Sequence, residues 1–354
     1  MFTIVLTLLF ASIHVSIGSE LCAIHNYSEV FLVVERCSEI TVFNVTVPAG
    51  ETLEFNLRKG SIVTLKGTIT FGFHAWSGPL LEFKGDGITV QGTRNSVING
   101  QGELYWDHKG DKGITKPQLI NVVASGGSLF KDLYVKNCPH HCFFIKNSEN
   151  IFVSGITLDV SEGDKDNFTG HNTDGFNLSG VENVIIENST VMNQDDCVVI
   201  NAGSNILVRN MDCSGGHGLS LSVTKEPVYN VTFTDSIVKK SANGLHVKTH
   251  IDGKETEIRN ITYKNIELKG ITNFGINIQQ DYKDGEGTGK PSSNIPIIHL
   301  VLSNITGTMN GNDSKPVQII CGDTGCLNWE WSDISITSNS TPSNCNYSPA
   351  GFSC

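Results

Sequence analysis

The chain has 354 residues, of which 36 are acidic, 25 are lysine or arginine and 10 are cysteine, and its formal net charge is −11 with histidine neutral. An acidic chain is a poor partner for nucleic acid, so nucleic-acid binding is excluded as a function class. A polyanionic substrate would also be repelled at long range, so a site for one must gather its own local cations.

The chain opens with a short apolar segment. Residues 1–18 contain Ile, Val, Leu, Phe and Ala but no Asp, Glu, Lys or Arg, and small residues stand near their end at Ser16 and Gly18. This pattern is typical of a secretory signal peptide, and the apolar run is too short to span a bilayer. We therefore predict a signal peptide over residues 1–18, a mature domain over residues 19–354, and a secreted, extracellular protein.

All ten cysteines fall into near pairs along the chain. An even count behind a signal peptide predicts disulfide bonds, and the absence of CxxC spacing argues against a metal site. The sequence leaves the connectivity open, but the near pairs are Cys22/Cys37, Cys138/Cys142, Cys197/Cys213, Cys321/Cys326 and Cys345/Cys354. Glycosylation sequons, as expected of a secreted protein, include Asn26, Asn44, Asn167, Asn188, Asn230, Asn260 and Asn304.

One strand type recurs through the middle of the chain, where helical periodicity is scarce. Each copy is a β-branched run that follows an asparagine, at Asn150, Asn183, Asn205, Asn230 and Asn260. The steps between these asparagines are 33, 22, 25 and 30 residues, a length typical of one coil of a parallel β-helix. We therefore predict an all-β solenoid and assign the asparagines to its tight corners.

A second strand type repeats in the same frame, with starts placed at Gly175, Asp196, Gly218, Gly244 and Gly275 and steps of 21, 22, 26 and 31 residues. Stacked coils lie about 4.8 Å apart. This alignment predicts that Asp174, Asp195 and His217 occupy equivalent positions on successive coils, with Asp196 beside Asp195.

On the next coil, His246 and Lys248 are two residues apart and so share a strand face. Corner-forming residues explain poorly why three carboxylates, a histidine and a lysine gather on four successive coils. Like charges stacked this closely are costly and shift pKa values, so the cluster predicts a functional site.

Such a cluster suits the hydrolysis of a glycosidic bond, which needs one carboxylic acid to protonate the leaving oxygen and one carboxylate to activate water. Crowding raises the pKa of at least one aspartate, so that an acid and a base coexist. Lys248 is placed to pair with the carboxylate of a uronic-acid sugar. Aspartate clusters also bind Ca²⁺, which leaves a calcium-dependent lyase as an alternative.

Three motifs carry a family resemblance: residues 172–176 (NTDGF), 194–197 (QDDC) and 216–220 (GHGLS). In order and spacing they resemble the signature of polygalacturonases, glycoside hydrolase family 28, and fungal endo-acting members look most similar. The resemblance implies an all-β, single-domain, right-handed parallel β-helix (a solenoid) as the catalytic domain. It also implies inverting, endo-acting hydrolysis of the α-1,4-galacturonosidic bonds of pectin and polygalacturonate by a monomer.

Carried over by position, the resemblance implies that Asp195 is the general acid and that Asp174 and Asp196 activate the water. It further implies that His217 tunes the protonation of the acid and that no metal or organic cofactor takes part. The implied substrate-binding residues are Asn172, His246, Lys248 and Tyr282.

Two positions depart from the family pattern. The family triplet Arg-Ile-Lys reads His246-Val247-Lys248 here, so an always-charged clamp is replaced by a group with an ordinary pKa of about 6.5. The alternative is therefore a catalytically impaired homologue that binds pectin fragments or a plant polygalacturonase inhibitor. Asn177 opens a formal sequon inside the first motif, and we expect it to stay unmodified within a stacked strand.

Three further features have competing interpretations. His140 and His141 lie between Cys138 and Cys142, which suits either substrate contact or a loop tied by a disulfide. Trp329 and Trp331 resemble a sugar platform, but we predict that they cap the solenoid. The glycine-rich residues 284–289 lack the strand-then-helix context of a phosphate loop, so they are predicted to form a loop beside the cleft.

Overall fold

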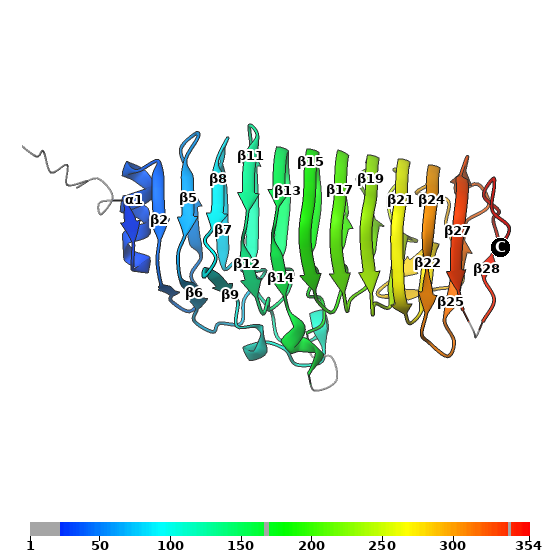
Figure 1. Ribbon diagram of the computed structural model, residues 1–354, viewed down its shortest axis with the longest axis horizontal. Coiled ribbons are helices and arrows are strands. Elements are labelled where there is room, and N and C mark those ends of the chain that lie inside the picture. The colour runs from blue at the N-terminus through cyan, green and yellow to red at the C-terminus, as the bar shows by residue number, and fades with distance from the viewer. Residues whose placement is uncertain (1–21, 166–169, 339–340) are drawn as a thin grey trace, which may run out of the picture.

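The computed structural model describes residues 22–165, 170–338 and 341–354. The predicted signal peptide and the sequon at Asn167 lie outside these residues. Figure 1 shows one elongated stack whose strands lie side by side across the long axis, with α1 (Val30–Arg36) at one end and the C-terminus at the other. Within the described residues every strand pairing is parallel except that of β22 (Phe274–Lys283) with β23 (Glu286–Gly287). The predicted right-handed parallel β-helix is thus confirmed.

Three columns of strands form the walls of the helix. The first column, which carries the site described below, takes one short strand or the first part of a longer one from each coil. In chain order it consists of β4 (Leu53–Asn56), β7 (Leu81–Asp86), β10 (Ile120–Ser125), β13 (Phe143–Ser154), β15 (Phe176–Met192), β16 (Val198–Ile200), β18 (Leu219–Val223), β20 (Asn243–His250), β22, β25 (Lys315–Ile320) and β28 (Asn344–Cys345).

The other two columns meet at a corner, and from β15 onward single long strands run through both of them. In the N-terminal half, the second column consists of β1 (Ala23–Ile24), β2 (Glu39–Val42), β5 (Ile62–Leu65), β8 (Thr89–Gly92) and β11 (Ser128–Lys131). The third column consists there of β3 (Val45–Val47), β6 (Thr68–Phe71), β9 (Val97–Asn99), β12 (Tyr134–Lys136) and β14 (Thr157–Asp159). The long strands that continue both columns are β17 (Gly203–Ser214), β19 (Val228–Lys239), β21 (Ile258–Ile271), β24 (Ile297–Met309) and β27 (Glu330–Thr337), with the short β26 (Cys326–Leu327) beside β24.

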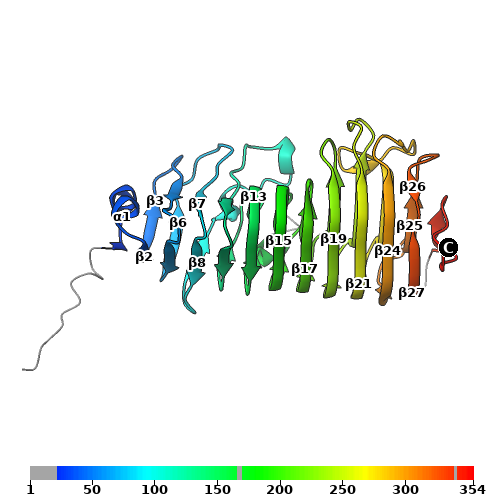
Figure 2. The same cartoon turned by 90° about the horizontal axis from the view of Figure 1, so that it is seen from above.

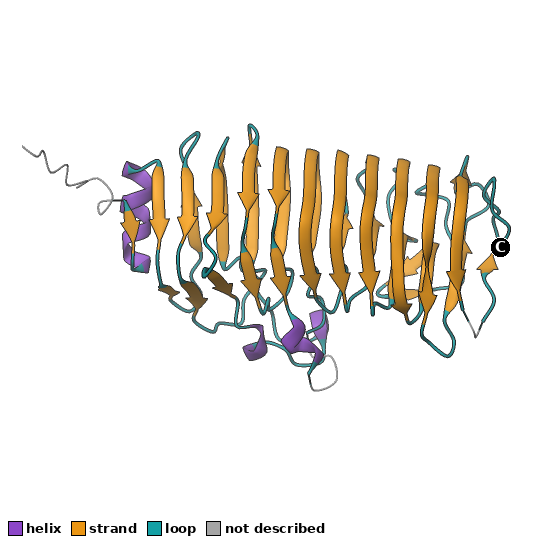
Figure 3. Ribbon diagram, in the orientation of Figure 1, coloured by secondary structure: helices purple, strands orange, loops and turns teal. Residues whose placement is uncertain are grey.

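Helices are short and lie at the N-terminal end or in the loops (Figure 3). Besides α1, they are the 3-10 turns η1 (Tyr27–Glu29), η2 (Gly102–Leu104), η3 (Gly110–Lys112) and η4 (Ser161–Asp164). Figure 2 shows loops that project from one side of the stack in two groups, one in the cyan part of the chain and one in the yellow part. No helix in the described part of the chain is long and apolar enough to cross a membrane.

Alternating residues of each strand point inward and stack on their equivalents in the next coil. Phenylalanines on five successive coils contact one another inside the stack, with ring centroids 5.2 to 6.0 Å apart; two of the four contacts, Phe55 with Phe83 and Phe143 with Phe176, join register partners. Such aromatic pairs contribute about 0.5–1.5 kcal/mol each beyond their burial. The contacting rings belong to Phe55, Phe83, Phe130, Phe143 and Phe176.

The predicted asparagine column is confirmed as structural. Its asparagines all have positive φ, between 54° and 59°, which asparagine adopts more readily than other non-glycine residues. Each side-chain amide donates to the side-chain oxygen of the preceding coil, from Asn183 to Asn150 (3.2 Å) through Asn260 to Asn230 (3.0 Å). The ladder therefore satisfies the polar corner of each coil with the corner of its neighbour.

Both ends of the stack are covered. At the start, α1 buries Val30, Val33 and Val34 against the first coils. At the other end, Trp329 and Trp331 are only 1% and 2% exposed, and their parallel rings are 6.1 Å apart. Side chains so deeply buried cannot form a sugar platform; the pair lies instead at the C-terminal end of the stack, beneath Tyr347 and Phe352.

Five disulfide bonds join the near pairs that the sequence suggested. They link Cys22 to Cys37, Cys138 to Cys142, Cys197 to Cys213, Cys321 to Cys326 and Cys345 to Cys354. The two cysteines of a bond are at most 16 positions apart. Each bond therefore joins residues of one coil or of two neighbouring coils.

Candidate active site

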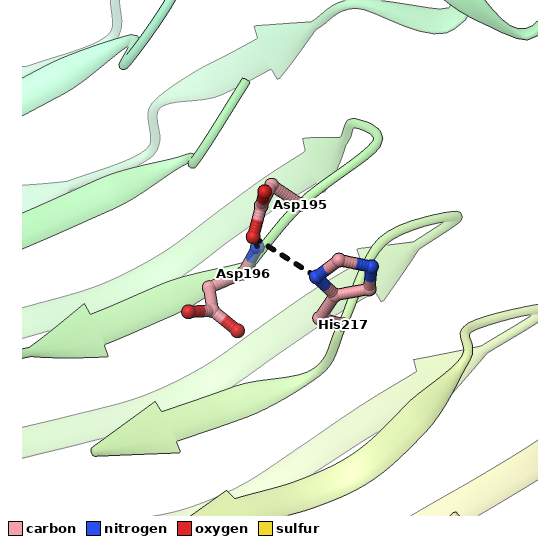
Figure 4. A group of neighbouring side chains, drawn as sticks. All are labelled: Asp195, Asp196 and His217. Carbon is pink, nitrogen blue, oxygen red and sulfur yellow. Dashed lines mark hydrogen bonds and ion pairs between the residues drawn. The ribbon is translucent and has the colours of Figure 1, made fainter. Parts of the chain in front are cut away.

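The register of the first column differs by one residue from the predicted alignment. Phe176 pairs with Val198, and Val198 pairs with Leu219. Asp196, not Asp195, is therefore equivalent to Asp174 and His217. The prediction was wrong because it aligned on glycine, whereas on this coil Cys197 takes that place and is held inward by its disulfide to Cys213. Asp195 and Asp196 precede β16, and their carboxyl groups are turned in different directions (Figure 4) although ligand oxygens of the two lie within 4.8 Å of each other.

His141 belongs to the same position one coil earlier, because Phe143 pairs with Phe176. Its Nε2 lies 3.8 Å from Oδ1 of Asp174. Burial first, and then the neighbouring His140, lower the pKa of His141 to about 3, so the ring is neutral. The sequence left the role of this histidine open. Its place two residues before a strand start, as for Asp174, is the signal that could have identified it.

Asp195 and His217 form an ion pair. Figure 4 shows the His217 ring turned toward the Asp195 carboxylate, with Nδ1 and Oδ1 3.0 Å apart. Burial alone would raise the pKa of Asp195, but the charge and hydrogen bond of His217 hold that pKa below its usual value. Burial alone would lower the pKa of His217, but Asp195 raises it to about 9. An ionised carboxylate therefore faces an imidazolium at neutral pH.

Asp196 lies beneath the surface with both carboxylate oxygens occupied. Oδ1 accepts a hydrogen bond from Oγ of Ser220, and Oδ2 is 2.9 Å from Nζ of Lys248. Burial would lower the pKa of Lys248, but the charge of Asp196 raises it above the usual value. The lysine expected to be free for a substrate carboxylate is thus already neutralised by the protein.

Asp174 is the carboxyl most inclined to keep a proton. Burial, followed by the charges of Asp195 and Asp196, raises its pKa well above the usual value. Nδ2 of Asn177 donates to its Oδ2 at 3.0 Å, and Asn177 is only 3% exposed. The three carboxyl groups thus lie beside only two cationic groups, His217 and Lys248.

A cleft of about 610 Å³ opens over this cluster. Asp195 and His217 line it, whereas Asp174 and Asp196 lie beneath the lining and are 8% and 2% exposed. The predicted substrate-binding residues Asn172, His246, Lys248 and Tyr282 all line the cleft. Glycines of the loop at 284–289 line it as well, which confirms the predicted position of that loop.

His246 is a neutral group in the floor of the cleft. It is 6% exposed, and its two ring nitrogens lie 3.4 Å from side-chain atoms of Asn243 and Gln279. Burial first, and then Lys248 and His217, lower its pKa well below the usual value. The sequence left the direction of this shift open, and the structure shows that burial and the cations outweigh the aspartates.

A second hollow of about 620 Å³ continues from the cleft. It lies between the loop at 108–112 and residues 282–285, and it shares Asn172 and Tyr282 with the cleft. Lys109 and Lys112 line this second hollow. Asp111 and Asp284 line it as well, so charges of both signs lie beyond Asn172, away from His246.

Asp195, Asp196 and His217 offer ligand atoms within 4.8 Å of one another, a spacing that suits a cation. A metal ion there would have to displace Lys248 from Asp196 and the proton that joins His217 to Asp195. The internal cations thus already supply the positive charge that a metal would bring.

Comparisons with known proteins agree on one family. The family model described as "Glycosyl hydrolases family 28" matches residues 37–354. A polygalacturonase of Phaedon cochleariae is 47% identical over 94% of this chain and 93% of its own length. Endopolygalacturonase I of Aspergillus niger is 41% identical over 94% of this chain and 91% of its own. The expectation that fungal proteins are the most similar was therefore wrong, because the identity to the insect protein is higher.

A solved structure shows the same similarity. Endopolygalacturonase I from Stereum purpureum, complexed with two galacturonates, superimposes with a TM-score of 0.84 at 33% identity. The match covers 91% of this chain and 96% of that one.

Proposed function

The chain belongs to glycosyl hydrolase family 28, and on that premise we propose that it is a secreted, monomeric endo-polygalacturonase. Its substrate is the α-1,4-galacturonosidic backbone of polygalacturonate and pectin. The observation that carries this proposal is the set of three aspartates, with His217, under one cleft. Relatives named endopolygalacturonase support the endo mode of cleavage.

Asp195 is the proposed general acid, because it is the carboxyl of the three that lines the cleft. A bound uronate adds negative charge beside it, which raises its pKa and favours the protonated form that a general acid needs. The His217 imidazolium then stabilises the Asp195 carboxylate once the leaving oxygen has taken that proton. His217 is thus a positioning and electrostatic group for the acid.

Asp174 and Asp196 are proposed to activate the water, with inversion at the anomeric carbon. Ligand oxygens of Asp195 and Asp196 lie within 4.8 Å, which is closer than the roughly 6.5–9.5 Å typical of inverting pairs. Asp196 is nevertheless a poor covalent nucleophile, since Ser220 and Lys248 occupy its two oxygens. NMR of the first product distinguishes the outcomes: the β anomer supports inversion, and the α anomer requires a covalent intermediate.

The decisive experiment incubates the purified protein with polygalacturonate at several pH values and measures reducing ends and product sizes. Early oligomers of mixed length support an endo-acting hydrolase, whereas monomer alone would indicate exo action. Asp195→Asn should lower turnover by about 10² to 10⁴, the usual cost of losing a general acid, and circular dichroism should report an unchanged fold.

The impaired-homologue alternative depends on His246 alone, because the three aspartates and His217 are all present. It predicts binding of oligogalacturonate, or of a plant inhibitor, without release of reducing ends at any pH. That outcome would overturn the hydrolase proposal.

A further inference from the structure

The half of the cleft that lies over β20, β22 and β25 is lined mainly by uncharged polar side chains. They are Asn243, His246, Asn277, Gln279 and Gln318, and Asp281 on β22 adds a carboxyl group. Lys248 is the single lysine or arginine among the described residues that line the cleft, and its charge is matched by Asp196 at 2.9 Å. Lys315 is a neighbour of this lining but not part of it, with Nζ 5.8 Å from the Phe274 ring centroid.

The amides and the His246 ring are joined to one another. Nδ2 of Asn277 donates to Oε1 of Gln279 at 2.7 Å, and Nε2 of Gln318 donates to Oδ1 of Asn277 at 3.2 Å. His246 reaches the same Gln279 oxygen from the other side, at 3.4 Å. The amide nitrogen Nε2 of Gln279 has no hydrogen-bond partner among the described residues. That nitrogen remains a neutral donor for a ligand oxygen.

Apolar side chains complete this half of the lining. Ala242, Phe274 and Ile320 border the amides in the same cleft. A carboxylate seated here would lose water without meeting an unmatched cation, which is unfavourable. A methyl ester offers instead a carbonyl that accepts from a neutral amide and a methyl group that packs on apolar carbon.

We propose that this half of the cleft binds a methyl-esterified galacturonate ring, so that the enzyme accepts partly esterified pectin on one side of the cleaved bond. The proposal rests on the proposed function and names the form of its substrate. The other hollow holds Lys109 and Lys112 beside Asp111 and Asp284, and its lysines can pair with rings that keep their free carboxylates. His246 is thus a specificity residue, and the arginine of the family would favour the unesterified ring.

The test uses galacturonate oligomers of one length that are either unesterified or carry a single methyl ester at each ring in turn. The parent enzyme should cleave at least one esterified oligomer with no loss of kcat/KM. Mass spectrometry should find that ester on only one of the two new chain ends. A parent that cleaves the unesterified oligomer but rejects an ester at every ring would overturn the proposal.

Two variants at the same position sharpen the result. His246→Arg should lower kcat/KM for the tolerated ester, relative to the unesterified oligomer, by about tenfold or more, the worth of one charge-assisted pair. His246→Gln keeps a neutral group and should keep the parent preference. His74→Arg is the matched control, because His74 is exposed and does not line the cleft. An unchanged ratio in folded His246→Arg would overturn the role of His246.

The two proposals fail in different ways. If no oligomer is cleaved, the hydrolase proposal is wrong, and calorimetric titration of the same oligomers still measures the ester preference. Tighter binding of the unesterified oligomer than of every esterified one would then overturn the proposal for the neutral half of the cleft. Equal or tighter binding of one esterified oligomer would support it.

Discussion

Nζ of Lys248 lies 2.9 Å from Oδ2 of Asp196, and their side chains are only 6% and 3% exposed. The two residues are 52 positions apart in the chain and stand on coils that stack through β16, β18 and β20. Removing one partner of a buried pair leaves the other charge without compensation. This ion pair therefore connects the stability of the fold with the charge balance of the site.

Lys248→Met should lower the free energy of unfolding by about 3–5 kcal/mol, because it leaves the Asp196 carboxylate buried and unpaired. Urea denaturation followed by circular dichroism measures this loss. Lys239→Met is the matched control, since Lys239 and Asp212 are 38% and 43% exposed and such pairs contribute about 0–1 kcal/mol. Equal losses in the two variants would contradict the buried pair.

The contribution of His217 to stability should depend on pH. The pKa of His217 is raised to about 9 in the folded protein, whereas it is about 6.5 in an unfolded chain. A raised pKa stabilises the fold fully below pH of about 6.5, and that stabilisation is lost as the pH rises through about 9. His217→Gln should thus lower the unfolding midpoint more at pH 6 than at pH 10. A difference that does not change with pH would count against the ion pair with Asp195.

Activity should survive a chelator, because Lys248 and His217 already supply the positive charge beside the aspartates. The measurement compares reducing-end release before and after treatment with EDTA, while ultraviolet absorbance monitors unsaturated products. Loss of activity that Ca²⁺ restores, together with an absorbing product, would establish the calcium-dependent lyase instead.

The asparagine ladder offers a test at Asn205, which accepts from Asn230 at 3.0 Å and donates to Asn183 at 3.1 Å. Asn205→Ala loses both hydrogen bonds and forces alanine to a φ of 57°, which costs about 1–2 kcal/mol by itself. Asn205→Gly loses the same hydrogen bonds but tolerates that φ. The alanine variant should therefore unfold at lower urea than the glycine variant, and the reverse order would refute the role of backbone conformation.

The sequence predicted the solenoid because its period is visible wherever an asparagine corner recurs. It did not predict the register at Asp195 and Asp196, because the glycine that marks the other coils is replaced there by Cys197. Two adjacent aspartates then fit either alignment equally well. The pairing of Phe176 with Val198 shows that Asp196 is the one equivalent to Asp174.

The charge state of His246 could not be predicted from the sequence either. Its pKa depends on burial and on cations from two other positions, Lys248 and His217. These contributions oppose those of the aspartates, and their balance depends on distances that no spacing along the chain provides. The position of His141, by contrast, could have been predicted from the sequence, because His141 stands two residues before a strand start, as Asp174 does.

The covered ends of the stack have a consequence for the molecule among its own copies. Every inner coil pairs with a coil on either side, so an uncovered terminal coil would present the same unpaired edge to another molecule. Helix α1 covers the first coil, and residues 344–354 cover the last, where Tyr347 and Phe352 pack on Trp329 and Trp331. The two covered ends therefore prevent molecules from stacking end to end into a filament.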